Sequence, residues 1–341
     1  MSLRAVVLGL IVVSGGTIAS VVGLAETCTT QSQMSAGERN DLASAAQEIA
    51  AKVQANDAAG LRAETIAEFT NNFGGLQNLI AETAPRLKGG AITVDQIYLL
   101  DASQSKAAQS IDAQFFCTLN RSASEAEFLI TGLIPGVYGF AVVRVSASPV
   151  EWVVPMLLRR EQGRWLLGGI YPRATQAAGH DGLWYWREAR RLSADKQRWN
   201  AWIYYGQAEA LLKPANFVQS SHLEKLRDEQ RSAAPPALSG GLGPDVPLVV
   251  KGPDGKEYQF TGVSTDDTLG KDKVDVSAHL RVDQIGDAMA ARKRNEDAMH
   301  ALLAAYPELR SSFQGIWIVA EPPGSSGQSA FATEQAMADL H

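Results

Sequence analysis

The first half of the chain changes from a helical to a strand-like hydrophobic period. Apolar residues spaced three and four apart predict three helices, over residues 35–53, 56–74 and 76–87. Ser35, three residues before Glu38, is a candidate capping box for the first of them. From residue 91 the period is two, which predicts strands over residues 91–100, 114–119, 127–134, 138–145, 150–160 and 164–171. Helices followed by a curved antiparallel sheet indicate an α+β fold.

The last predicted hairpin carries a family resemblance. Its sequence is LLRREQGRWLLGGIYP, with the turn at Glu161-Gln162-Gly163. Together with the order of elements over about residues 36–173, it resembles the nuclear transport factor 2-like (polyketide-cyclase-like) cone. The resemblance implies a curved sheet around a cone-shaped interior. It implies little about function, because this fold hosts enzymes, ligand binders and assembly domains.

The second half divides by composition. Residues 182–231 are helical in pattern and contain four of the seven tryptophans, and the segment 202–206 is similar to the first helix of a tetratricopeptide repeat. Residues 232–247, rich in proline and glycine, predict a linker. Strands over 248–251, 257–263, 274–280 and 315–320 with a helix over 282–306 predict a small α+β domain at 248–321. The predicted organisation is therefore a cone-like domain at 26–181, a helical hairpin packed on it at 182–231, the linker, the small domain, and a disordered tail at 322–341.

The N-terminus predicts export. Arg4 precedes an uncharged stretch, Ala5–Ala25, which ends in small residues and is typical of a signal peptide over residues 1–25. The alternative is an anchor in the inner membrane through residues 5–24, which are numerous enough to span a bilayer. The two cysteines, Cys28 and Cys117, follow this segment and predict a disulfide in the periplasm or at the cell surface.

Charge and motifs narrow the function. The chain of 341 residues has 31 basic and 37 acidic side chains, a net charge of −6, which disfavours nucleic-acid binding. No P-loop, nucleophile elbow, dinucleotide-binding glycine motif or metal-spaced histidine cluster occurs, so no catalytic residue, cofactor or metal is predicted. The adjacent His180 and Asp181 point apart and indicate a turn. Four acidic residues have no calcium-loop spacing and indicate a solvated loop: Asp266, Asp267, Asp272 and Asp275.

Two candidate binding sites remain. The first is a pocket inside the cone, where an arginine among aromatic residues would suit an apolar or anionic small ligand. Its expected residues are Tyr98, Tyr138, Phe140, Arg144, Trp152 and Tyr171. The second is a surface for another envelope protein or for self-association. Four tryptophans are more than the core of one helical hairpin requires, so at least one is expected to be exposed to a partner or shared with the cone. Its expected residues are Trp184, Trp186, Trp199 and Trp202.

These observations predict an exported, non-catalytic protein of the cell envelope that binds a protein partner or an apolar or anionic small ligand. All five histidines follow the cone, whereas enzymes of the resembled family usually place a histidine, aspartate or tyrosine inside it. The alternative is a hydrolase or isomerase with its site in the cone. Membrane association is expected only if the N-terminal segment is retained.

Overall fold

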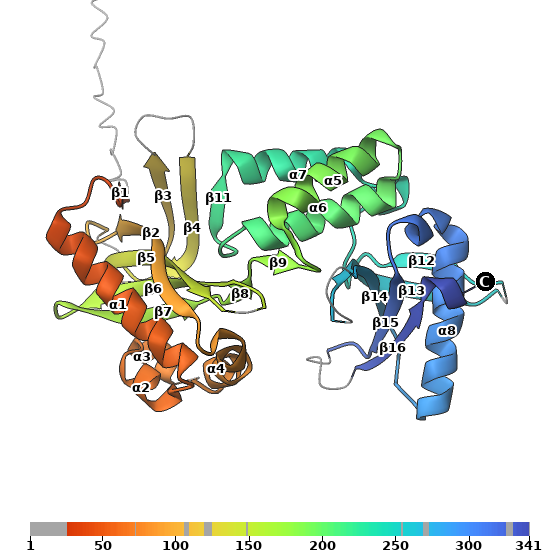
Figure 1. The fold of residues 1–341 in the computed structure, drawn as a ribbon, viewed down its shortest axis with the longest axis horizontal. Helices are drawn as coiled ribbons and strands as arrows, with labels where there is room; N and C mark the ends of the chain where they lie inside the picture. The colour runs from red at the N-terminus through yellow and green to blue at the C-terminus, as the bar shows by residue number, and fades with distance from the viewer. Residues whose placement is uncertain are drawn as a thin grey trace, which may run out of the picture.

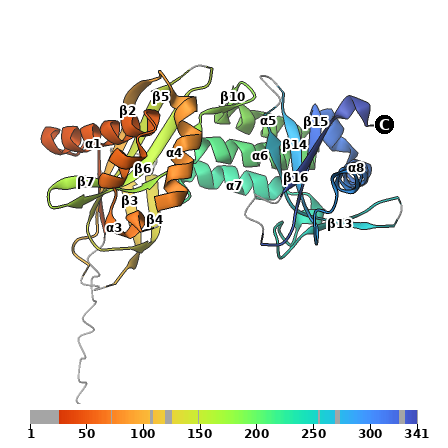
Figure 2. The same ribbon diagram turned by 90° about the horizontal axis from the view of Figure 1, so that it is seen from below.

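A computed structural model describes residues 26–71, 73–105, 109–118, 125–147, 149–253, 255–268, 273–324 and 330–340. Its helices and largely antiparallel sheets confirm the α+β class. The molecule has an N-terminal lobe and a C-terminal lobe, which lie side by side in two perpendicular views (Figures 1 and 2). The predicted signal peptide lies outside the described residues. Within them, no helix has both the length and the apolar character that a membrane span requires.

The N-terminal lobe begins with helices of uneven length. These are α1 (Ala36–Gln54), α2 (Ala58–Ala63), α3 (Ala67–Thr70) and α4 (Phe73–Leu87). The capping box at the start of α1 is confirmed, with the Glu38 amide donating to Ser35 Oγ over 3.3 Å and the Ser35 amide to Glu38 Oε2 over 3.1 Å. The single helix predicted over 56–74 is wrong. The Ile66 amide donates to the Leu167 carbonyl over 3.0 Å, so the chain leaves the helix there to pair with a strand.

The strands of this lobe form two sheets. The larger has the order β1 (Thr27–Thr30), β2 (Ala91–Asp101), β5 (Val137–Ser146), β6 (Trp152–Glu161) and β7 (Arg164–Ile170), with β8 (Arg173–Ala174) also on β6. The smaller has the order β11 (Val218–Ser220), β4 (Glu125–Leu133) and β3 (Ile111–Thr118). Because side chains alternate along a strand, the larger sheet has two distinct faces. Val143 and Met156 pack under α1 and α4, whereas Phe140 and Leu157 pack towards the smaller sheet.

A disulfide joins the two sheets. Cys28 in β1 and Cys117 in β3 are bonded, with their Cα atoms 5.2 Å apart, which confirms the predicted pair. The bond connects positions 89 residues apart and fixes the first strand of the lobe. It therefore holds the smaller sheet against the edge of the larger one.

The C-terminal lobe combines helices with a five-stranded sheet. The chain enters through β9 (Gln176–Ala177) and β10 (His180–Asp181), followed by α5 (Gly182–Ala194), α6 (Arg198–Leu212) and α7 (Ser221–Ala233). The sheet has the order β12 (Leu248–Lys251), β13 (Glu257–Asp266), β14 (Asp275–Arg281), β15 (Gly315–Glu321) and β16 (Phe331–Ala336). The parallel pair β14 and β15 is connected through α8 (Ala288–Ala305). Short 3-10 turns lie at Pro236–Leu238, Pro307–Ser311 and Met337–Asp339.

The predicted disordered tail is wrong for its described part, 330–340. β16 pairs with β15 along its whole length, from Phe331 opposite Ala320 to Ala336 opposite Gly315. The buried Asn295 side chain of α8 donates to the Phe331 carbonyl over 3.0 Å and to Thr333 Oγ1 over 3.1 Å. Backbone pairing holds this strand, although its small and polar residues give no period-two apolar signal.

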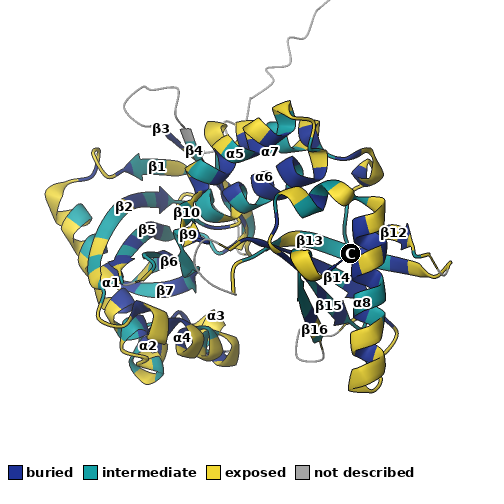
Figure 3. Cartoon of the chain, turned by 45° about the vertical axis from the view of Figure 1, so that its right-hand side comes forward, coloured by how far each residue is buried: buried dark blue, intermediate teal, exposed yellow. Residues whose placement is uncertain are grey.

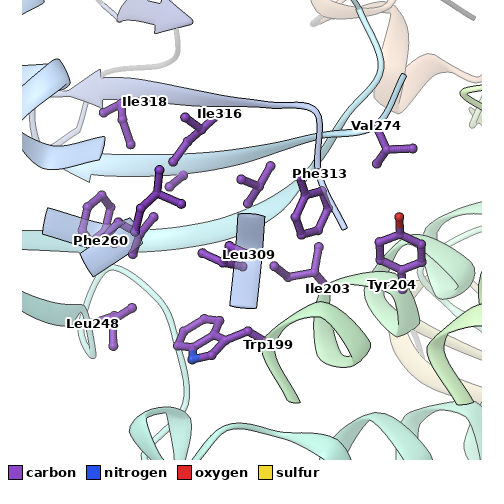
Figure 4. Close-up of a cluster of buried hydrophobic side chains, with 14 of the residues drawn as sticks. Trp199, Ile203, Tyr204, Leu248, Phe260, Val274, Leu309, Phe313, Ile316 and Ile318 are labelled. Carbon is purple, nitrogen blue, oxygen red and sulfur yellow. The ribbon is translucent and has the colours of Figure 1, made fainter. Parts of the chain in front are cut away.

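The predicted linker does not separate two cores. One buried cluster runs from the helices α5–α7 into the five-stranded sheet, and Ala233, Leu238 and Leu248 around the proposed boundary belong to it. Figure 4 shows Trp199 and Ile203 of α6 beside Leu309, which lies in the turn between α8 and β15. Helix α6 is buried along much of its length, as Figure 3 shows. The helices predicted to pack on the cone as a separate hairpin therefore share their core with the C-terminal sheet.

Candidate functional site

The loop between α6 and α7, residues 213–220, returns from the C-terminal lobe to the N-terminal one. Val218 to Ser220 form β11 and pair with Phe128 to Ala126 of β4, and the Leu129 amide donates to the Phe217 carbonyl over 2.8 Å. At the base of the loop, the Arg173 guanidinium donates to the carbonyls of Ala210 and Leu211 over 2.9 and 3.1 Å. These carbonyls end α6, where a cation is favourable. Burial lowers the pKa of Arg173 to about 10.

This loop completes a row of aromatic rings between the two sheets of the N-terminal lobe. Tyr98 meets Phe128 at 5.2 Å between ring centroids, and Phe128 meets Phe140 at 5.2 Å. Phe217 of the loop continues the row, 5.6 Å from Phe140 and 5.4 Å from Tyr171. All four contacts are edge-to-face, which is a favourable geometry for aromatic pairs.

The first of two cavities beside this row, the interlobe cavity, lies where the lobes meet and has a volume of about 440 Å³. Its walls are mostly apolar, with aromatic rings from both lobes, and its polar side chains are few. Ser220 Oγ accepts the Leu223 amide over 3.2 Å as the N-cap of α7, so it is already engaged. The lining residues are Gln96, Tyr98, Ala126, Phe128, Phe140, Leu183, Trp186, Leu212, Pro214, Val218, Gln219, Ser220, His222 and Leu223.

The second, the outer cavity, has a volume of about 600 Å³ and lies between β4, α3 and the ends of β5 to β7. Its walls include the exposed side chains of Phe69 and Leu129. Arg159 Nη1 lies 3.1 Å from Glu68 Oε1 and 3.3 Å from Glu161 Oε1, and its guanidinium stands 5.9 Å above the Tyr138 ring. The positive charge in this cavity is therefore already balanced by carboxylates.

The structure brings four of the six predicted pocket residues into this interior and excludes two. Tyr98 and Phe140 line the interlobe cavity, while Tyr138 and Tyr171 line the outer one. Arg144 lines neither, because it forms ion pairs with Asp95 and Glu151. Those hydrogen bonds raise the pKa of Arg144, so its charge is retained and neutralised in place.

Trp152 also lies elsewhere. It packs with the core on the helix-covered face of the larger sheet, with the Arg86 guanidinium 5.6 Å above its ring. Its place follows from strand alternation, since Trp152, Val154 and Met156 all point towards the helices. The predicted apolar stripe on this strand therefore faces α1 and α4, not the cavities.

The tryptophans predicted as a partner surface are core residues. Trp186 and Trp199 are buried, and Trp184 and Trp202 are half-buried. Trp186 Nε1 donates to Glu229 Oε2 over 2.8 Å, and its ring lines the interlobe cavity. Trp199 lies 4.4 Å from the Tyr306 ring, and Trp184 stacks on His180 at 3.7 Å. An exposed tryptophan surface is therefore not present on these helices.

The other sequence candidates have structural partners. The Trp184 amide donates to Asp181 Oδ1 over 2.7 Å, so Asp181 caps α5. Asp266 accepts the Thr268 amide, Asp267 accepts the Ala178 amide, and Asp275 accepts from Trp317, so the described acidic residues serve separate contacts; Asp272 lies outside the described residues. No group of metal-ligating side chains that would hold an ion occurs in the part of the chain that the structure describes.

Sequence reasoning missed Phe217, Phe128 and the return of residues 213–220 to the N-terminal lobe. This segment, KPANFVQS, has neither helical nor alternating apolar period, so no pattern marks Phe217 as part of a distant interior. Comparisons of the chain with protein-family models, with curated proteins and with solved structures found no match.

Proposed function

We propose that the protein is an exported, non-catalytic binding protein that holds a compact, uncharged apolar molecule in the interlobe cavity. The observation that carries this proposal is the cavity itself. Tyr98, Phe128 and Phe140 of the N-terminal lobe face Trp186 and Leu183 of the C-terminal lobe across a volume of about 440 Å³. Small-molecule sites are typically apolar cavities of about 300 to 1,000 Å³ and are frequent where domains meet.

The electrostatics favour an uncharged ligand over an anionic one. Arg144 and Arg159 each contact two carboxylates, so neither offers an unbalanced positive charge. Burial raises the pKa of Tyr98, which keeps its phenol neutral at physiological pH. An apolar ligand would lose its water shell without leaving a buried charge unpaired.

The cavity offers little support for the alternative of an enzyme. A nucleophile needs a base within hydrogen-bond reach, and Ser220 is the aliphatic hydroxyl on this lining. Its oxygen caps α7, and no hydrogen bond to His222 occurs within the described part of the chain. These contacts suit a wall of a binding site better than a reaction centre.

Export and a cone-like N-terminal lobe are part of the same proposal. The N-terminal pattern of residues 1–25 supports export, and the Cys28–Cys117 disulfide is typical of an oxidising compartment. Helices on one face of the larger antiparallel sheet, with cavities on its other face, support the resemblance to the nuclear transport factor 2-like cone.

The test compares two matched substitutions, Leu183→Glu at the interlobe cavity and Met289→Glu on α8. Both residues are exposed, at 54% and 85%, and both follow an aspartate N-cap by two positions. Fluorescence titration with N-phenyl-1-naphthylamine should show binding to the wild type. Leu183→Glu should weaken it about 10-fold, because a charge replaces apolar contact area worth about 1 to 2 kcal/mol.

The stability of both variants should stay within about 0.5 kcal/mol of the wild type, as expected for exposed positions. Met289→Glu should bind the probe like the wild type. Equal probe affinity in all three proteins, or no saturable binding to the wild type, would refute the proposed cavity function.

A further inference from the structure

The interlobe and outer cavities follow one interior surface. Along β5, Phe140 lines the interlobe cavity and Tyr138 the outer one; along β4, Phe128 lines the interlobe cavity and Ile130 the outer one. Residues two apart on a strand point to the same face and are about 7 Å apart. On both β5 and β4, therefore, moving two residues along the strand leads from the lining of one cavity to the lining of the other.

The returning loop, residues 213–220, contributes residues to both cavities. Pro214 and Val218 line the interlobe cavity, whereas Asn216 and Phe217 line the outer one. The Phe217 ring is in edge-to-face contact with Phe140, which lines the interlobe cavity, and with Tyr171, which lines the outer cavity. Phe217 therefore lines the outer cavity and contacts the Phe140 ring, which lines the interlobe cavity.

We infer that Phe217 is a specificity-determining residue that divides one elongated apolar interior into two compartments. In the wild type it limits a ligand to a compact molecule that fills one compartment. Without its ring, the interior accepts an extended, uncharged single-chain molecule of the long-chain alcohol type. This inference rests on the proposed function, because it concerns the size of the ligand that the same interior binds.

The charged pair in the outer cavity supports an alcohol as the extended ligand. Arg159 supplies N–H donors, and Glu68 and Glu161 supply acceptor oxygens 3.1 and 3.3 Å away, so no positive charge is left unbalanced there. A hydroxyl group both donates and accepts one hydrogen bond and requires no counter-charge. An apolar chain then has the aromatic row from Tyr171 to Tyr98 as its wall.

The test measures how affinity depends on chain length in Phe217→Ala. Phe116→Ala is the matched control, because Phe116 is 56% exposed and lines neither cavity. Displacement of N-phenyl-1-naphthylamine by 1-octanol and 1-tetradecanol gives an affinity ratio for each protein. Phe217→Ala should raise the preference for 1-tetradecanol by roughly 10-fold for every two additional methylene groups that become buried. Phe116→Ala should keep the wild-type ratio.

Phe217→Leu provides a second variant with a smaller loss of packing, and its ratio should lie between those of the wild type and Phe217→Ala. The same ratio in wild type and both Phe217 variants would overturn the partition while leaving the proposed function standing. A ligand-free crystal structure of Phe217→Ala is an independent readout. One continuous cavity in this variant supports the partition. Two cavities that are still separated, by rearranged rings of Phe140 and Tyr171, overturn it. This readout holds even if no protein binds an alcohol and the proposed function fails.

Discussion

Trp199 provides a sharp test of the core shared by the helices and the C-terminal sheet. Its side chain is 3% exposed, and its ring lies 4.4 Å from that of Tyr306 at the end of α8. Its amide donates to Glu308 Oε1 over 3.1 Å, and the side chain of Asn200 donates to the Glu308 carbonyl over 2.7 Å. Replacing Trp199 by alanine therefore leaves a void at the junction between α6 and the segment that precedes β15.

The expected cost follows from that burial. Truncation of a buried tryptophan to alanine typically lowers the free energy of unfolding by about 3 to 5 kcal/mol. A folded domain has about 5 to 15 kcal/mol in total, so Trp199→Ala should remain folded while opening far more often. In amide hydrogen exchange, this cost corresponds to a loss of protection of roughly 100- to 3,000-fold wherever the affected core unfolds as a unit.

The assay is hydrogen exchange with mass-spectrometric readout, analysed strand by strand. Trp199→Ala should lower protection in β14 and β15 as well as in α5 to α7, and leave β5 and β6 nearly unchanged. The control is Trp165→Ala in the N-terminal lobe, where the ring is 8% exposed and Nε1 donates to Asp41 Oδ2 over 3.0 Å. Trp165→Ala should lower protection in β5 and β6 and leave β14, β15 and α5 to α7 nearly unchanged.

A shared core is refuted if Trp199→Ala lowers protection in the helices alone and leaves β14 and β15 at the wild-type level. That result would mean that the helices and the sheet unfold as independent units. The boundary between cores would then lie at residues 232–247, as the composition of the segment suggests.

Reduction of Cys28–Cys117, or the double substitution of both residues by serine, should lower the free energy of unfolding by about 4 to 5 kcal/mol in the chain-entropy model for a loop of this length. Urea denaturation with and without reductant measures this, and equal midpoints would contradict it. Burial raises the pKa of Asp275 above its ordinary 3.8. Its contribution to stability is thus present in acid and is lost as the pH rises through the raised pKa. As the pH rises from about 4 to about 7, Asp275→Asn should gain stability relative to the wild type, which urea denaturation at both pH values measures. An equal change in the free energy of unfolding of the two proteins would contradict this prediction.

Local patterns predicted the parts of the fold that depend on local chemistry. The capping box of Ser35 and Glu38 marks the start of α1, because its two hydrogen bonds form within four residues. The alternating apolar residues of β5 and β6 predict strands because one face of each is buried under helices. The cysteine pair followed from the small number of candidates and not from geometry.

Local sequence patterns could not predict contacts between segments that are distant in the chain. Arg144 was expected in a pocket, but its partner Asp95 lies 49 residues away on a neighbouring strand. β11 has three residues and pairs through its backbone, so no side-chain period marks it. The proline- and glycine-rich segment at 232–247 has the composition of a linker, yet Leu238 within it is buried in the core of the C-terminal lobe.

The path of the chain between the lobes has a mechanical consequence. The polypeptide crosses from the N-terminal lobe near residue 172, returns before β11, and crosses again at the start of α7. A single connection would let the lobes swing about a hinge, whereas connections at separate points oppose both rotation and sliding. Exchange of a ligand at the proposed interlobe site would therefore proceed by small movements of side chains and loops, with the overall dimensions of the protein unchanged.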